Sequence, residues 1–170
     1  IHQFFSRGDT VYATLEPEAE RFLTLDRQKT APDDRAKILL PLVFCRECGQ
    51  EYYCVWLHAD DSGREVLLPR DLGELREEEK SAGFLFRSSD PGLAWPSDEA
   101  KQIERVPDDW VDELKGVARI SPKRAGDMPR PIRIATDGTV GSGLGFHFLG
   151  APLRFCLNCG IVHGSRQRGP

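Results

Sequence analysis

Two similar cysteine pairs, far apart along the chain, restrict its fold more than any other feature of the sequence. Residues 45–49 read Cys-Arg-Glu-Cys-Gly and residues 156–160 read Cys-Leu-Asn-Cys-Gly, with 107 residues between Cys48 and Cys156. A two-residue gap lets both thiolates bind one ion, and the following glycine tolerates the positive φ of a tight turn. Each pair follows a strand-like run that ends in phenylalanine. The sequence therefore predicts two zinc-ribbon halves that share one closed, structural Zn²⁺ site, with Cys45, Cys48, Cys156 and Cys159 as ligands.

The cysteine count also predicts the redox environment. The chain has five cysteines, and an odd number in a chain of 170 residues is a poor basis for a disulfide scaffold. We therefore expect a reducing, cytoplasmic compartment. Cys54 is expected to be a buried strand residue, and His163 is an alternative ligand. Two unrelated buried cysteine pairs remain the other interpretation, whereas a thioredoxin-like redox motif would open a helix that this sequence lacks.

The chain length favours one domain, because 170 residues with 39% hydrophobic content form a single core. We expect a β-rich α+β fold in which the zinc site closes a single domain over residues 1–163. The ribbon halves are expected near 38–58 and 146–163, the inserted mixed region at 59–145 with two short helices at 71–82 and 106–116, and a flexible tail at 164–170. Strands are expected at 2–5, 11–15, 21–25, 38–44, 51–58, 83–86, 117–120, 132–135 and 146–155. The apolar run 38–44 is too short to cross a membrane.

Charge is distributed unevenly along the chain. The formal net charge is −4, made up of −3 over residues 1–60, −7 over 61–116 and +6 over 117–170. A basic final third predicts a surface that faces nucleic acid, and its densest cations are Lys123, Arg124, Arg130 and Arg133. The equally open alternative is that these cations pair with the acidic middle of the same chain. We expect Phe146, Phe148 and Phe155 to fill the core rather than to stack on bases.

The sequence contains no recognisable catalytic pattern. The glycine-rich segment 141–145 lacks the Gly-Lys-Ser/Thr ending of a phosphate-binding loop, and a strand is expected to follow it. No nucleophile elbow and no paired carboxylates suited to acid–base catalysis are present. We therefore predict no catalytic residues, while an enzyme with an unrecognised site is the weakest alternative.

Four segments, in this order, resemble a known family: residues 2–5, 11–16, 41–53 and 154–160. The series resembles a region of large bacterial DEAD/DEAH-box helicases of superfamily 2, located after the second RecA-like motor domain. The resemblance implies a zinc-binding accessory domain of an ATP-dependent DNA helicase, from relatives associated with DNA repair and phage defence. The chain has no ATP-binding motif, so it is not the motor itself. The missing start methionine leads us to expect a piece of a longer protein.

Two hypotheses of function follow from these observations. In the first, the domain supports nucleic-acid engagement, with DNA as the partner, in the full-length helicase. In the second, it is a protein–protein adapter that uses the acidic face of residues 61–116. Salt-dependent DNA binding separates the two, because only the first depends on phosphate contacts.

Overall fold

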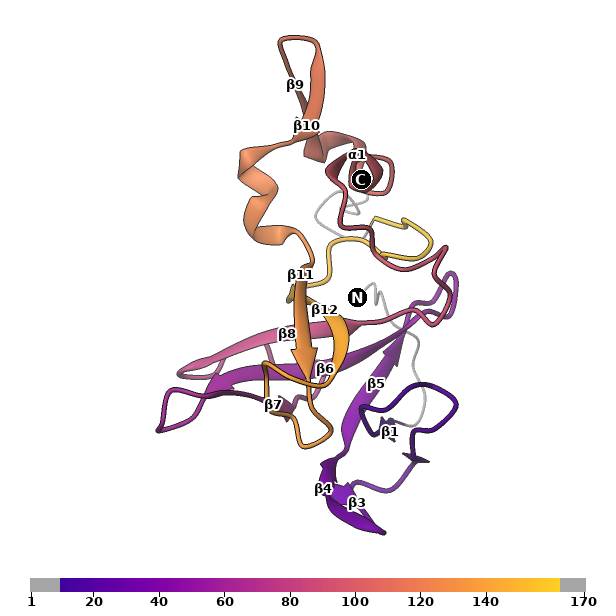
Figure 1. Ribbon diagram of the computed structural model, residues 1–170, viewed down its shortest axis with the longest axis vertical. Coiled ribbons are helices and arrows are strands. Elements are labelled where there is room, and N and C mark those ends of the chain that lie inside the picture. Colours follow the sequence, from indigo (N-terminus) through magenta and orange to yellow (C-terminus); the bar gives the residue numbers. More distant parts are fainter. Residues whose placement is uncertain (1–9, 163–170) are drawn as a thin grey trace, which may run out of the picture.

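The computed structural model describes residues 10–162 and is dominated by one antiparallel sheet (Figure 1). The eight-stranded sheet has the order β11-β12-β8-β6-β5-β1-β2, and β7 pairs with β6. Its strands are β1 (Val11–Ala13), β2 (Leu23–Thr24), β5 (Leu40–Phe44), β6 (Glu51–Ala59), β7 (Glu65–Pro69), β8 (Lys80–Phe86), β11 (Arg130–Ile134) and β12 (Leu144–Gly150). The predicted β-rich character is confirmed. The strand expected at residues 2–5, the tail at 164–170 and His163 lie outside the described residues.

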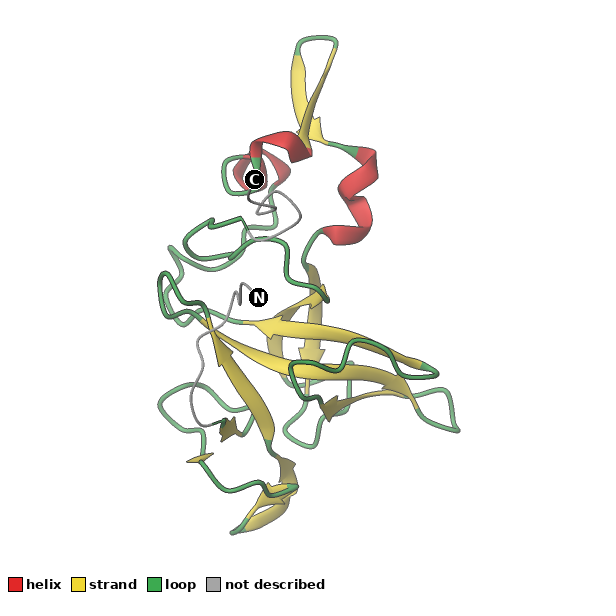
Figure 2. Ribbon diagram, turned by 180° about the vertical axis from the view of Figure 1, so that it is seen from behind, coloured by secondary structure: helices red, strands yellow, loops and turns green. Residues whose placement is uncertain are grey.

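The remaining elements are short. Two separate hairpins consist of β3 (Thr30–Ala31) with β4 (Asp34–Ile38), and β9 (Val111–Leu114) with β10 (Val117–Ile120). The helical elements are α1 (Glu99–Ile103) and the 3₁₀ helices η1 (Asp108–Trp110) and η2 (Pro122–Asp127). Figures 1 and 2 show β9–β10 projecting at one end of the molecule, beside the helical elements, with β3–β4 at the opposite end.

Alternation along the long central strand β6 divides the core between the two faces of the sheet. Successive side chains of a strand point to opposite faces. Accordingly, Tyr52 and Cys54 belong to one buried cluster, whereas Tyr53 and Val55 belong to the other. The cluster on the Tyr52 face contains Cys45, Cys156 and a set of aromatic side chains from distant segments, namely Phe84, Phe86, Trp95, Trp110 and Phe155. Cys54 is fully buried, as expected.

The helix predicted at residues 71–82 is wrong. Residues 71–79 form turns and an isolated bridge, and β8 begins at Lys80. The buried guanidinium of Arg70 donates hydrogen bonds to the carbonyl oxygens of Leu72 and Glu74, so these groups have acceptor roles outside a helix. The segment also lacks the apolar stripe that holds a helix against a core. Residues with a high helix propensity are therefore not sufficient to make this segment a helix.

The helix predicted at residues 106–116 is also wrong. Only η1 is helical, and β9 and β10 follow it as a hairpin. Lys115 and Gly116 connect the two strands with φ values of 53° and 78°. Positive φ at both central residues is typical of the two-residue turn whose twist matches an antiparallel hairpin. Gly116, the last residue of the predicted helix, is the second residue of this turn.

Among residues 10–162, no helix has the length and apolar character required to cross a membrane.

Candidate metal centre

The first cysteine pair lies in the turn that joins β5 to β6. The amide of Cys45 donates to the Gln50 carbonyl oxygen at 2.9 Å, and the amide of Gly49 donates to the Cys45 carbonyl oxygen at 2.8 Å. Gly49 has a φ of 79°, which a side chain would make costly. The two strands are paired directly beside the turn, with Phe44 opposite Glu51. This first knuckle, residues 45–50, is thus the end of a regular hairpin.

The second cysteine pair has the same backbone arrangement in a different setting. The amide of Cys156 donates to the Ile161 carbonyl oxygen at 3.0 Å, and the amide of Gly160 donates to the Cys156 carbonyl oxygen at 2.9 Å. Gly160 has a φ of 77°. This second knuckle, residues 156–161, is flanked by a single isolated bridge between Phe155 and Val162. The two knuckles therefore have the same backbone hydrogen bonds, but the segments that flank them differ.

The four paired cysteines converge on one point. Their sulfur atoms all lie within 4.8 Å of one another. Cys45 Sγ is 3.8 Å from Cys159 Sγ, and Cys48 Sγ is 3.7 Å from Cys156 Sγ. A disulfide requires about 2.05 Å, so these distances are not disulfide bonds. Four sulfurs at about 2.3 Å from a tetrahedral ion are separated by about 3.8 Å. The cluster thus has dimensions that suit a metal ion.

The cluster has a buried side and an exposed side. Cys45 and Cys156 are buried, whereas Cys48 and Cys159 are exposed. Burial raises the pKa of the Cys156 thiol to about 12. Burial also acts upward on Cys48, but hydrogen bonds from Asn158 and the Gln50 amide outweigh it and lower the pKa of Cys48 to about 7. The buried thiol therefore needs the charge of a cation to become a thiolate more than the exposed one does.

Side chains from each half reach the sulfur atoms of the other half. The Tyr52 hydroxyl lies 3.2 Å from Cys156 Sγ and accepts a hydrogen bond from the Leu157 amide at 2.9 Å. In the opposite direction, the Asn158 side-chain amide donates to Cys48 Sγ at 3.4 Å. In protein metal sites, hydrogen bonds from surrounding groups typically hold the ligands in their orientation. Sequence inspection missed these residues, because their partners lie more than a hundred positions away.

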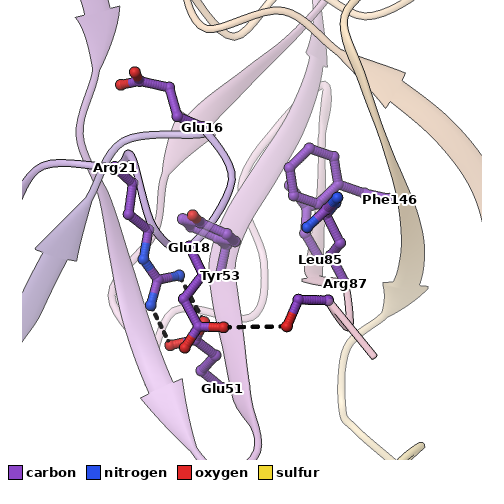
Figure 3. Close-up of a pocket in the computed structure, with 9 residues that line it drawn as sticks. Glu16, Glu18, Arg21, Glu51, Tyr53, Leu85, Arg87 and Phe146 are labelled. Atoms are coloured by element: carbon purple, nitrogen blue, oxygen red, sulfur yellow. Dashed lines mark hydrogen bonds and ion pairs between the residues drawn. The ribbon is translucent and has the colours of Figure 1, made fainter. Parts of the chain in front are cut away.

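The first knuckle is supported by a nearly buried ion pair. Arg21 Nη1 lies 2.6 Å from Glu51 Oε1 and Arg21 Nη2 lies 2.7 Å from Glu51 Oε2. Figure 3 shows the Arg21 guanidinium directed at the Glu51 carboxylate in a cavity that also contacts Tyr53. The Arg21 side chain is only 7% exposed. A bidentate pair of this kind fixes both side chains, and so it fixes the first residue of β6.

The second knuckle is supported by Arg105, which follows α1. Its guanidinium donates to the carbonyl oxygens of Leu157, Leu93 and Ala94, and it lies 5.1 Å from the centre of the Trp95 ring. Within residues 10–162, no carboxylate forms an ion pair with Arg105. The Arg105 guanidinium is therefore held beside the second knuckle by carbonyl oxygens and an aromatic ring.

The predicted nucleic-acid residues on η2 have different environments. Lys123 is exposed. Arg124 is 3.4 Å from Asp127 and 3.8 Å from Asp109, and its guanidinium lies 4.9 Å from the centre of the Trp110 ring. Arg124 is therefore already engaged in contacts within the chain.

The two predicted arginines on β11 do not share a face. Arg130 and Arg133 are three residues apart, so strand alternation directs them to opposite sides. Arg130 lies 5.6 Å from the centre of the Phe148 ring, and Arg133 Nη2 donates to the Gly143 carbonyl oxygen at 2.8 Å. The structure therefore does not bring the four predicted cations together on one surface. Phe146, Phe148 and Phe155 are buried, as expected.

Comparison with models of protein families, with curated proteins and with solved structures found no match to this chain.

Proposed function

We propose that this chain is a non-catalytic, zinc-binding accessory domain of an ATP-dependent DNA helicase, in which two zinc-ribbon halves share one structural Zn²⁺. One observation carries the metal part of the proposal: four sulfurs from knuckles 108 positions apart (Cys48 to Cys156) lie within 4.8 Å of one another. Four thiolates prefer zinc over magnesium or calcium, and a site with four protein ligands has no open position for chemistry. The ion therefore acts as a cross-link between the two ends of the inserted region.

The metal part is tested by elemental analysis and by unfolding. The purified chain is expected to contain one zinc per molecule, and a chelator should lower its melting temperature sharply because binding energy is folding energy at such sites. Cys48→Ser should have the same effect. Cys54→Ser is a control for zinc content, since Cys54 is a cysteine outside the cluster; it should retain the zinc. Zinc-free wild-type protein with unchanged melting in chelator would refute the metal part.

The DNA-binding part is supported by the family resemblance and by the basic final third of the chain. The exposed Lys123 and Arg133 are the best candidates for phosphate contacts, because Arg124 is engaged with Asp109 and Asp127. Each phosphate contact contributes about one unit to the slope of log affinity against log salt. Lys123→Glu and Arg133→Glu should each weaken binding of single-stranded or duplex DNA and reduce this slope.

A control variant sharpens the DNA experiment. Arg35→Glu changes an exposed cation on β4, at the end of the molecule opposite η2 (Figure 1). It makes the same charge reversal, so it should leave DNA affinity close to that of the wild type. Equal losses in all three variants would show that only net charge matters, and unchanged affinity in all three would remove the support for nucleic-acid engagement.

A protein–protein adapter is the second candidate function, and the exposed leucines of the acidic segment favour it. Leu75, Leu93 and Leu114 are 52%, 45% and 51% exposed, within the segment 61–116 that carries a net charge of −7. Exposed apolar side chains with acidic neighbours suit a partner with an apolar, basic surface. Zinc-loaded protein that binds neither single-stranded nor duplex DNA at low salt would favour the adapter.

A further inference from the structure

The position of Tyr52 connects the central sheet with the second knuckle. Tyr52 is the second residue of β6, four positions after Cys48, and its side chain is completely buried. Its ring packs against Phe84 at 6.5 Å between ring centres and against Phe86 at 5.8 Å. These contacts fix the ring, so the hydroxyl has a defined place beside Cys156.

The donor and acceptor roles of the Tyr52 hydroxyl follow from its two neighbours. The backbone N–H of Leu157 can only donate, so the phenolic oxygen of Tyr52 accepts this hydrogen bond, which is 2.9 Å long. The second neighbour, Cys156 Sγ at 3.2 Å, carries no proton when it binds a metal. The hydroxyl hydrogen is therefore directed to the sulfur, and both hydrogen-bonding functions of a buried group are satisfied.

We propose that Tyr52 is a positioning residue of the metal centre, and that its hydroxyl donates a hydrogen bond to the Cys156 thiolate. This inference rests on the proposed zinc site. Four thiolates around a divalent ion leave excess negative charge, and Cys156 carries its share in a buried position. An O–H···S bond stabilises that charge and holds Cys156 Sγ at 3.7 Å from Cys48 Sγ.

The test compares Tyr52→Phe with Tyr53→Phe, using Co²⁺ as the probe. Both substitutions remove one phenolic hydroxyl from a buried ring of β6, but the Tyr53 hydroxyl donates to the Thr14 carbonyl oxygen at 2.7 Å on the other face of the sheet. Tyr52→Phe should lower Co²⁺ affinity by about tenfold, measured by competition with a chelator. The thiolate-to-cobalt absorption of this variant should also move to longer wavelength, because Cys156 Sγ is a stronger electron donor without the hydrogen bond from Tyr52. Tyr53→Phe should change neither property.

Each result has a distinct meaning. Wild-type affinity and spectrum in Tyr52→Phe would overturn the role of Tyr52 while leaving the metal site intact. Wild-type protein that does not bind Co²⁺ or Zn²⁺ would overturn the metal site itself and the role of Tyr52 with it. A change of equal size in Tyr53→Phe would also overturn the proposal, since it would reflect a general loss of packing.

A second measurement covers the case in which Tyr52→Phe does not fold. Wild-type protein loaded with a spin-active cadmium isotope should give an NMR signal for the Tyr52 hydroxyl proton that is scalar-coupled to the metal through Cys156 Sγ. The absence of such a coupled signal in a folded, cadmium-loaded sample would overturn the hydrogen bond. Its presence would establish the bond without any substitution.

Discussion

The two knuckles have the same backbone hydrogen bonds and differ in what holds them. The first knuckle closes a hairpin in which β5 and β6 are paired up to its edge, with Val43 opposite Tyr52. The second has one isolated bridge, between Phe155 and Val162, and otherwise depends on side chains from elsewhere. A Cys-x-x-Cys-Gly sequence thus specifies the turn, while the surrounding contacts determine how much a bound metal would add to its support.

Metal removal should produce the largest loss of stability, and it should affect the second knuckle more than the first. At a free zinc concentration of about a thousand times Kd, a bound ion adds about 4 kcal/mol to the free energy of unfolding. Hydrogen exchange should show that the amides of Cys156 and Gly160 lose protection when zinc is removed, whereas that of Cys45 stays protected because strand pairing supports it. Equal loss of protection in both knuckles would contradict the proposed difference in support.

Single-ligand variants should show the next largest effect. Cys156→Ala removes a fully buried proposed ligand and leaves the Tyr52 hydroxyl without its sulfur neighbour. Cys48→Ala removes an exposed proposed ligand, which water can replace. An unsatisfied buried polar group costs about 1–3 kcal/mol, so Cys156→Ala should destabilise the protein by that amount more than Cys48→Ala. Denaturant unfolding in the presence of zinc measures the difference, and equal free energies of unfolding would show that burial of the ligand is unimportant.

Arg105→Met should weaken the second knuckle together with the segment 93–95 that Arg105 also contacts. The substitution keeps an extended side chain over Trp95 but removes the donors to the carbonyl oxygens of Leu157, Leu93 and Ala94. We expect a loss of about 1–2 kcal/mol in the free energy of unfolding. Arg64→Met is the control, because Arg64 is 65% exposed and its ion pair with Asp60 is weak. A similar loss in both variants would argue against a specific role of Arg105.

The cysteine cluster could be predicted from sequence because its information is local. Two residues between the cysteines and a following glycine define the turn, whatever lies around it. The roles of Tyr52 and Arg105 could not be predicted, because their partners are distant in sequence and only the fold brings them together. The error at residues 71–82 has the same origin, because Arg70 donates hydrogen bonds to the carbonyl oxygens of Glu74 and, on β8, Gly83. The error at residues 106–116 has a local origin, the hairpin turn at Lys115 and Gly116.

Asn158→Ala should cause the smallest loss of stability and of Co²⁺ affinity among these variants. Asn158 and Tyr52 each cross from one half to a sulfur of the other, but Asn158 Nδ2 reaches the exposed Cys48 at 3.4 Å, whereas Tyr52 lies 3.2 Å from the buried Cys156. Water can replace the lost donor at an exposed sulfur, so the free energy of unfolding should fall by less than about 0.5 kcal/mol, and Co²⁺ affinity should fall less than in Tyr52→Phe. A larger loss of affinity in Asn158→Ala would reverse the order of the two contacts and would locate the important hydrogen bond on the exposed side of the cluster.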